Sequence, residues 1–169
     1  MGGQALSPQP VVGIMDAAAV QAGANSSCAL LMDGTVSCWG YNADGQLGTN
    51  SPVCVDCVDP TPAAVVNLSG VAEIALGFRH ACARRTDGTV ACWGDNQYGQ
   101  LGDGMAPTDA PVPVEVSGLT GAVAIGAGND HTCAFLDDGT ATCWGRNHQG
   151  QLGDGTMTDS PVPVAVVGL

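Results

Sequence analysis

Eight cysteines carry the strongest chemical signal in this sequence, because thiols either pair as disulfides or bind metals. Six of them form three pairs of the form Cys-x9-Cys, and each pair brackets an Asp-Gly dipeptide. The spacing is not that of zinc ligands, whereas Asp-Gly between two apolar runs favours a β-hairpin. We therefore expect disulfides within hairpins, in the pairs Cys28/Cys38, Cys82/Cys92 and Cys133/Cys143.

The geometry of these hairpins follows from the same spacing. If Cys28 faces Cys38, the pairing is centred on Asp33 and the loop contains an odd number of residues. A three-residue loop from Met32 to Gly34 places the glycine last, where the common loop of this length needs a left-handed residue. Directly opposed cysteines on neighbouring strands lie within bridging distance, so the same disulfide is expected in all three copies.

The remaining cysteines, Cys54 and Cys57, stand close together in a Cys-x2-Cys arrangement. This form occurs in zinc sites, but a structural zinc needs four ligands and the sequence holds no second pair of this kind. A disulfide that clips a loop is the favoured interpretation, and a partner-specific surface feature is the alternative. Eight pairable cysteines imply an oxidising compartment.

Few other residues could do chemistry. His80 and His131 occupy equivalent positions in repeated segments, with Ser26 at the third, and such recurrence favours a structural hydrogen bond within each repeat. A Gly-x-Ser-x-Gly elbow, a phosphate-binding loop and a His-Glu-x-x-His motif are all absent, so we expect no enzyme, no metal and no cofactor. The oxygen-rich stretches 103–109 and 154–159 lack the ligand spacing of a calcium loop.

Charge and composition exclude several classes of partner. The 169 residues include 16 Asp and Glu against 4 Lys and Arg, a net charge of −12. Nucleic acids and anionic membranes attract clustered cations, so neither is an expected partner. No apolar run is long enough to span a bilayer.

Residues 1–10 lack the features of a signal peptide, so either a signal has been removed or the protein is cytosolic. The cysteines favour the former, with an extracellular, periplasmic or cell-surface location.

The sequence segments that contain the paired cysteines belong to a repeat that occurs three times. The segments CWGYNADGQLG, CWGDNQYGQLG and CWGRNHQGQLG begin at Cys38, Cys92 and Cys143. With 25 Gly, 10 Pro and 45% hydrophobic residues, many short strands are favoured over disorder. Each repeat contains four candidate strands. They are 17–23, 28–32, 35–39 and 62–66 in the first repeat; 71–77, 82–85, 89–93 and 113–116 in the second; and 122–128, 133–136, 140–144 and 163–167 in the third.

Four short strands in a period of about 50 residues predict an all-β fold of β-propeller blades, each with four antiparallel strands. The small residues of the first strands fit a crowded inner position, and prolines that open the fourth strands suit a sheet edge. We expect the repeated tryptophan, at positions 39, 93 and 144, to pack between blades.

The same residues carry a resemblance to a known family. Gly-x-x-His-x-Cys-Ala, followed by Asp-Gly-Thr-x-x-Cys-Trp-Gly-x-Asn-x-x-Gly-Gln-Leu-Gly, resembles the regulator of chromosome condensation repeat, and most of all its bacterial, cysteine-bearing versions. The resemblance covers about residues 8–169 and implies a β-propeller of four-stranded blades. Closed rings of this family usually have about seven blades, whereas this chain has three repeats.

Three blades form only part of a propeller. We expect one partial propeller domain over residues 1–169, with repeats at about 13–66, 67–117 and 118–169. Within residues 1–12 begins an extra copy of the proline-strand element, because Pro8–Ile14 (PQPVVGI) matches Pro163–Leu169 (PVAVVGL). Exposed strand edges are normally covered, so a homo-oligomer, as a dimer of three-blade arcs, is favoured. A piece of a longer array is the alternative.

Strand alternation places the loops that differ between repeats on one face and the Asp-Gly hairpins on the other. Variable loops on a constant scaffold usually carry binding specificity, and aromatic and arginine residues dominate interface energetics. Drift on a solvated surface is the alternative. The candidate partner-binding residues are Tyr41, Asp44, Phe78, Arg79, Asp95, Gln97, Tyr98, Asn129, Asp130, Arg146 and His148.

Two functions from different classes remain open. The first is a non-enzymatic, secreted, disulfide-stapled module for protein–protein interaction, with an unknown protein partner and a ring closed by self-association. The second is a self-assembling structural or envelope building block whose only partner is itself. The resemblance implies relatives such as a guanine-nucleotide exchange factor for a small GTPase and an inhibitor of β-lactamases. Neither role is carried by matching residues in this chain.

Overall fold

The computed structural model describes residues 7–53 and 56–169, which form three sheets of four antiparallel strands each. The first blade contains β1 (Ala17–Ala22), β2 (Ser26–Leu31), β3 (Val36–Tyr41) and β4 (Val58–Ala64). The second contains β5 (Val71–Leu76), β6 (His80–Arg85), β7 (Val90–Gly94) and β8 (Ala110–Glu115). The third contains β9 (Ala122–Ala127), β10 (His131–Leu136), β11 (Ala141–Gly145) and β12 (Ser160–Ala165).

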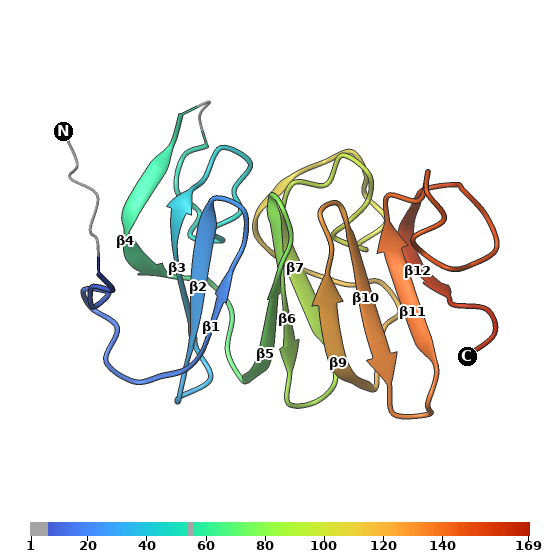
Figure 1. Cartoon of the computed structure of the whole chain (residues 1–169), viewed down its shortest axis with the longest axis horizontal. Coiled ribbons are helices and arrows are strands. Elements are labelled where there is room, and N and C mark those ends of the chain that lie inside the picture. The colour runs from blue at the N-terminus through green and yellow to red at the C-terminus, as the bar shows by residue number, and fades with distance from the viewer. Residues whose placement is uncertain (1–6, 54–55) are drawn as a thin grey trace.

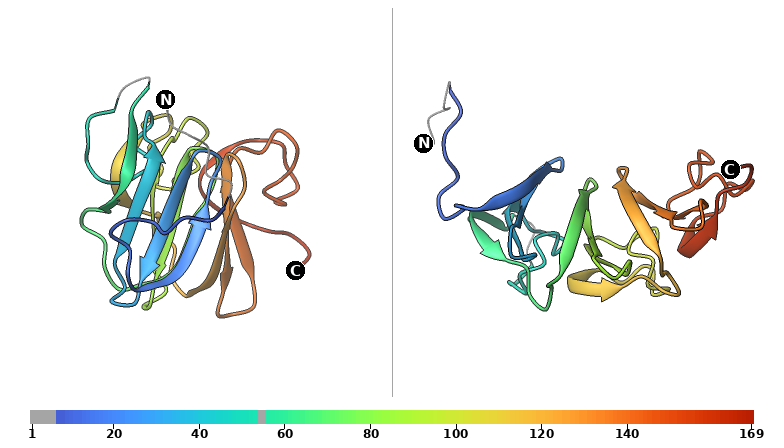
Figure 2. Two further views of the ribbon diagram at one scale, coloured as in Figure 1. Left: turned by 60° about the vertical axis from the view of Figure 1, so that its left-hand side comes forward. Right: turned by 90° about the horizontal axis from the view of Figure 1, so that it is seen from below.

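Strands follow chain order within every sheet, as expected for propeller blades. The blades succeed one another around an open arc, with the first and third blades at its opposite ends (Figures 1 and 2). Figure 1 also shows the long loops at one end of the strands and the short hairpins at the other. Residues 7–16, which include most of the extra proline-strand copy, lie outside the three sheets.

The hairpin disulfides are confirmed by the strand register. Cys28 faces Cys38, Cys82 faces Cys92 and Cys133 faces Cys143, with Cα–Cα distances of 4.1, 4.0 and 4.0 Å. The turn between β2 and β3 has the expected centre, since Leu31 N–H donates to the Thr35 carbonyl and Gly34 adopts a φ of 79°. The proposed Cys54–Cys57 pair is not tested, because Cys54 lies outside the described residues.

An aspartate fixes each of these turns. The Asp33 carboxylate accepts hydrogen bonds from the Thr35 backbone N–H at 2.9 Å and hydroxyl at 2.6 Å, and Asp87/Thr89 and Asp138/Thr140 repeat the arrangement. These bonds favour the ionised carboxylate and lower the pKa of Asp33. The Asp-Gly-Thr motif thus specifies the turn by its own side-chain chemistry.

The fourth strands start earlier than predicted. The sequence placed them from Pro62, Pro113 and Pro163 onward, whereas β4, β8 and β12 already include the preceding proline of each segment. The register with the third strand shifts at these prolines: Gly94 pairs with Ala110 and Cys92 with Val114, and Pro111 and Pro113 lie in the irregular stretch between the two pairs. The missing N–H groups therefore cost no registered pair, and the strand continues through both prolines.

The hydrophobic core lies between blades. Cys28, Leu30 and Val36 of the first blade pack against Ile74 and Trp93 of the second in one buried cluster. A second cluster repeats the arrangement between blades two and three. Each sheet therefore presents its cysteine side to the following blade and its tryptophan side to the preceding one.

The predicted packing of the repeated tryptophan between blades is confirmed for the second and third copies but not for the first, which lies at the open end of the arc. Trp93 and Trp144 are 0% exposed, whereas Trp39 is only partly buried because no blade of this chain precedes it. The crowded inner position predicted for the first strands is wrong for β1, in which all six residues are exposed. In β5, by contrast, Val71 and Ile74 are buried.

Within residues 7–53 and 56–169, no helix could cross a membrane. The same residues contain no group of three or more His, Cys, Asp or Glu side chains arranged to hold a metal ion. Asp103 and Asp154 of the two oxygen-rich stretches accept hydrogen bonds from the Asn96 and Asn147 side chains of their own blades, which gives them a structural role.

The disulfides should differ in their accessibility to a reductant. Cys28, Cys38, Cys82 and Cys92 are 0% exposed between blades, whereas Cys133 is partly exposed on the open side of the third blade. A single three-blade arc, kept so dilute that it does not self-associate, should therefore carry label first on Cys133 and Cys143 after brief treatment with a phosphine reductant and alkylation, as read by peptide mass spectrometry. Labelling of all three pairs at one rate would contradict this order.

Candidate partner-binding face

The loops that carry the variable residues are braced by the Asn-x-x-Gly-Gln-Leu-Gly motif itself. Asn96 Oδ1 accepts a hydrogen bond from Leu101 N–H at 3.1 Å, and Gln100 Oε1 accepts one from Tyr98 N–H at 2.9 Å. Asn42 and Asn147 repeat the first bond in their own blades. The asparagines are 0–2% exposed, so they act as buried supports. This bracing holds the variable side chains on a fixed backbone.

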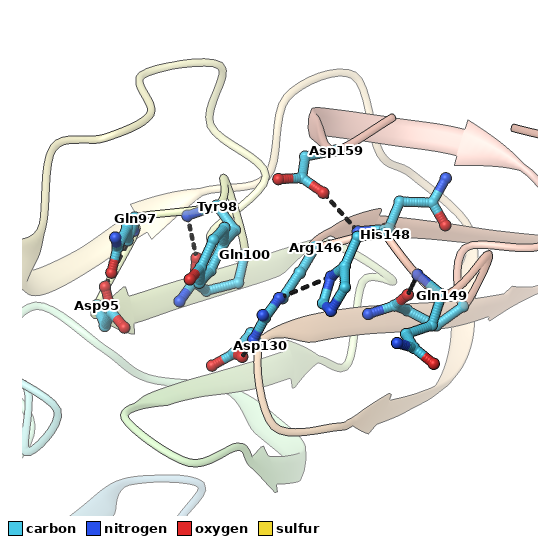
Figure 3. A network of polar contacts seen from close by, with 11 residues as sticks. Asp95, Gln97, Tyr98, Gln100, Asp130, Arg146, His148, Gln149 and Asp159 are labelled. Atoms are coloured by element: carbon cyan, nitrogen blue, oxygen red, sulfur yellow. Dashed lines mark hydrogen bonds and ion pairs between the residues drawn. The ribbon is translucent and has the colours of Figure 1, made fainter. Parts of the chain in front are cut away.

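Arg146 organises the part of the face between blades two and three. Its guanidinium donates to Asp130 Oδ2 at 2.8 Å and to His148 Nδ1 at 2.8 Å, and lies 4.6 Å from the ring centre of Tyr98 (Figure 3). The hydrogen bond to Asp130 raises the pKa of Arg146, so the guanidinium remains charged. Tyr98 comes from the second blade and Arg146 from the third, so the contact spans the junction between them.

A second arginine makes the equivalent link between blades one and two. Arg79 approaches Asp44 of the first blade, with 3.5 Å between Nη1 and Oδ2, and lies 5.5 Å from the ring centre of Phe78. Partial burial raises the pKa of Asp44, and the neighbouring Arg79 charge opposes that effect. Two cation–π contacts therefore recur on one face, each beside a carboxylate.

Seven of the predicted residues surround one pocket. It has a volume of about 270 Å³ and is lined by Phe78, Arg79, Asp95, Gln97, Tyr98, Asn129 and Asp130. Asp44, Arg146 and His148 connect to this lining through Arg79 and Asp130. Tyr41 lies apart from the lining, at the end of β3 where its backbone pairs with Val58.

The pocket has an acidic character. Burial raises the pKa of Asp95, and the nearby carboxylates of Asp109, Asp44 and Asp130 raise it further, while Gln97 N–H donates to the Asp95 carboxylate and opposes the shift. Asp109 was not among the predicted residues. It ends the same loop between β7 and β8 that carries Asp95, and its Oδ1 accepts from Asn96 N–H at 2.9 Å.

The predicted hydrogen bond of the repeated histidine lies between blades and not within one. His80 Nε2 is 2.9 Å from Thr132 Oγ1 of the next blade, and the Thr132 hydroxyl donates to the Gln100 carbonyl at 3.1 Å. His80 must therefore donate from Nε2, as a neutral ring. Its complete burial lowers its pKa to about 4. The expectation of a bond within the blade was wrong because the buried His80 side chain meets Thr132 across the junction with the next blade.

Two profiles of one repeat family match this sequence. Both are described as the regulator of chromosome condensation (RCC1) repeat. One matches residues 17–46, 71–100 and 122–151, and the other matches 33–84, 87–135 and 138–169.

Curated relatives agree with this match. The ultraviolet-B receptor UVR8 of Arabidopsis thaliana is 35% identical over 147 residues, which cover 85% of this chain and 33% of the receptor. The secretion-regulating guanine nucleotide exchange factor of Mus musculus is 32% identical over 181 residues, covering 95% of this chain and 39% of that protein. The chain thus spans little more than a third of the length of these relatives.

Solved structures show the same fold. Prp20p of Saccharomyces cerevisiae, in a study that also describes its binding to Gsp1p and histones, superposes with a TM-score of 0.83 at 22% identity over 91% of this chain and 39% of that one. Human WBSCR16 gives a TM-score of 0.77 at 24% identity over 89% of this chain and 38% of its own. With its repeated blades, hairpins and matching profiles, the chain belongs to the regulator of chromosome condensation (RCC1) repeat family of β-propellers.

Proposed function

We propose that this chain is a secreted protein–protein interaction module, which binds a protein partner through the face around the Tyr98–Arg146 contact and closes its ring by self-association. No chemical step is assigned to it. The observation that carries the proposal is the pocket between blades two and three, where variable side chains meet on a rigid support. Relatives that include an exchange factor support the interaction class.

The chemistry of the face favours a basic partner. The carboxylates of Asp44, Asp109 and Asp130 all act on Asp95 of the pocket lining, and the two nearby arginines, Arg79 and Arg146, are already paired. Arg79 and Phe78 remain exposed, at 45% of the arginine side chain and 41% of the phenylalanine. Lysine or arginine side chains of a partner would enter a negative, partly desolvated pocket rimmed by aromatic rings.

The proposed location rests on the three hairpin disulfides. Disulfides of this kind persist in oxidising compartments, outside the cytosol. Expression with a secretion signal in a host that exports the protein, followed by thiol counting under denaturing conditions, tests this part independently. Six or more oxidised cysteines support it, and reduced cysteines in natively produced protein refute it.

Replacing Tyr98 with alanine tests the face. Tyr98 is partly exposed and packs on Arg146, so we expect the variant to fold but to bind the partner at least about tenfold more weakly, as interface aromatics commonly do. The partner is first captured from the extracellular fraction of the source, identified, and then titrated as a purified protein. Arg79→Ala should behave in the same way.

Met32→Ser is the matched control, because Met32 is 76% exposed on a hairpin at the opposite end of the strands. The assigned face would be refuted if the partner bound Tyr98→Ala, Arg79→Ala and Met32→Ser with equal affinity. If the wild-type chain retains only further copies of itself, the self-assembling building block is the correct function. The unpaired ends of the arc favour that second candidate.

A further inference from the structure

The junction between blades is built twice in this chain with the same contacts. Trp93 Nε1 donates to the Gln46 carbonyl of the preceding blade at 3.0 Å, and Trp144 Nε1 donates to the Gln100 carbonyl at 2.9 Å. Both tryptophans are 0% exposed, and the two glutamines are 0–2% exposed. The first and second blades each offer a socket, defined by the backbone carbonyl of Gln46 or Gln100, that the tryptophan of the next blade fills.

The outer edge of each junction is closed in a second way. Asn50 N–H of the first blade donates to the Pro111 carbonyl of the second at 3.3 Å, and Gly104 N–H of the second donates to the Pro161 carbonyl of the third at 2.9 Å. Gly99 lies so close to Pro161 that a Cβ would collide with its backbone. These contacts hold the fourth strand of one blade against the loop of the blade before it.

The third blade carries an empty copy of this socket. Gln151 stands at the position of Gln46 and Gln100 but is partly exposed, and a Cβ on Gly150 would meet only the Thr156 carbonyl, at 3.9 Å. On the sheet of the same blade, an apolar depression of about 200 Å³ is open. Phe135 lies there 47% exposed, although its counterpart Leu30 is 6% exposed in the first junction. The lining of the depression is Ala124, Ile125, Gly126, Cys133, Ala134, Phe135 and Ala141.

The first blade carries the matching free insert. Trp39 occupies the position of Trp93 and Trp144 but is only partly buried, and Pro60, the counterpart of Pro111 and Pro161, is exposed. Both residues face away from the second blade, on the side where no blade of the chain lies. The two ends of the arc thus carry the two halves of one junction.

The polar residues at the two free ends match those of an existing junction, which indicates that the first blade of a second copy is the partner of the third blade. At the junction of blades two and three, His80 pairs with Thr132. At the junction of blades one and two, the same positions hold Ser26 and Ala81, which need no such bond. At the two free ends they hold His131 and Ser27, because Ser27 faces Trp39 as Thr132 faces Trp144. Joining the two ends would therefore place a histidine opposite a hydroxyl, as in the His80–Thr132 pair.

We propose that two copies of this chain join head to tail, with Trp39 Nε1 of each copy donating to the Gln151 carbonyl of the other. In the same junction, His131 Nε2 donates to the Ser27 hydroxyl and Phe135 is covered. Two arcs of three blades make a ring of six, within the size range of propellers, and the two junctions are identical. The inference specifies the self-association on which the proposed function relies.

The decisive experiment compares two variants alone and mixed. Trp39→Ala removes the insert but leaves the socket, and Phe135→Asp places an unpaired carboxylate in the socket but leaves the insert. Native mass spectrometry and sedimentation of the non-reduced wild type should give a discrete dimer. Each variant alone should be monomeric, with a dissociation constant at least about a hundredfold higher, because both junctions are damaged.

Mixing the two variants should restore a heterodimer. One of its junctions combines the intact Trp39 of the Phe135→Asp chain with the intact socket of the Trp39→Ala chain. An isologous interface, in which the same patch meets itself, would not be restored in this way. Circular dichroism confirms folding of both variants, which is expected because Phe135 and Trp39 are not fully buried in the single arc. Met32→Ser serves as a control that should remain dimeric.

Trp39 also reports the junction directly. It is the one tryptophan of the arc that is not fully buried, so its fluorescence should shift to shorter wavelength as the protein concentration rises through the dissociation constant. Trp39→Phe should lose this shift. A dimer that survives both Trp39→Ala and Phe135→Asp would overturn the junction but leave self-association intact. A wild type that remains monomeric would overturn both, while partner binding by the Tyr98 face is measured separately.

Discussion

Replacing Trp144 with alanine should lower the free energy of unfolding by about 3–5 kcal/mol, the usual cost of truncating a buried tryptophan. Trp144 is 0% exposed and fills the junction between blades two and three. Its Nε1 also donates to the Gln100 carbonyl at 2.9 Å. The substitution leaves a cavity that the rigid sheets on either side cannot close, so most of the packing energy is lost. Urea denaturation of dilute protein measures the effect.

Two further variants separate the loss of the tryptophan N–H from the loss of ring packing, and a buried position from an open one. Trp144→Phe keeps much of the ring volume but not the N–H, and the Gln100 carbonyl still accepts from Thr132, so a loss of about 1–2 kcal/mol is expected. Trp39→Ala removes the same repeat residue from the open end of the arc, where it is partly exposed, and should cost clearly less than Trp144→Ala. Equal losses at positions 39 and 144 would contradict the assignment of the open end.

Acidification should destabilise the protein through His80. The pKa of His80 is lowered from the ordinary 6.5 to about 4 by complete burial, with smaller effects from Asp130 and His131. The folded state therefore binds the proton more weakly than the unfolded chain does. The stability that neutral His80 contributes is complete above pH 6.5 and is lost as the pH falls to about 4. The total loss is about 3 kcal/mol, of which about 2 kcal/mol has occurred by about pH 5.

His80→Gln provides the comparison for this titration. Glutamine can donate to Thr132 but does not ionise in this range, so the variant should lose much less stability than the wild type between about pH 7.5 and about pH 5. The carboxylates of Asp44 and Asp95, whose pKa values are raised, titrate in both proteins and cancel in the difference. Parallel stability curves for the two proteins would show that His80 is not the group responsible.

The local structure was predictable because its determinants lie within a few residues of one another. Asp33, Gly34 and Thr35 specify a three-residue turn by their own hydrogen bonds, and the turn centre fixes which cysteines face each other. Repetition of that unit predicted the three sheets and their strand order. The start of the fourth strands was missed because proline was taken as the first residue of a strand, whereas an irregular stretch of an edge strand accommodates proline.

The candidate face was predictable only as a set of loop positions. Differences between repeats located the residues, but not the contacts of Arg146 with Tyr98 and Asp130, which depend on how adjacent blades are placed. Asp109 was missed because its approach to Asp95 depends on how the loop before β8 folds back. Its equivalent in the third blade, Asp159, makes the same bond to Asn147 N–H, whereas the first blade has Val58 at this position.

By itself, the sequence determined the repeat, the hairpins, the disulfide pairs of those hairpins and the family. All of these depend on contacts within one blade or on residue types at fixed spacing. Only the tertiary structure decided that the repeated histidine and tryptophan bond across blades, that the acidic pocket lies at a junction, and that the arc ends in an empty socket and an unburied insert. These features arise where the cysteine side of one blade meets the tryptophan side of the next, and burial there depends on whether a neighbouring blade is present.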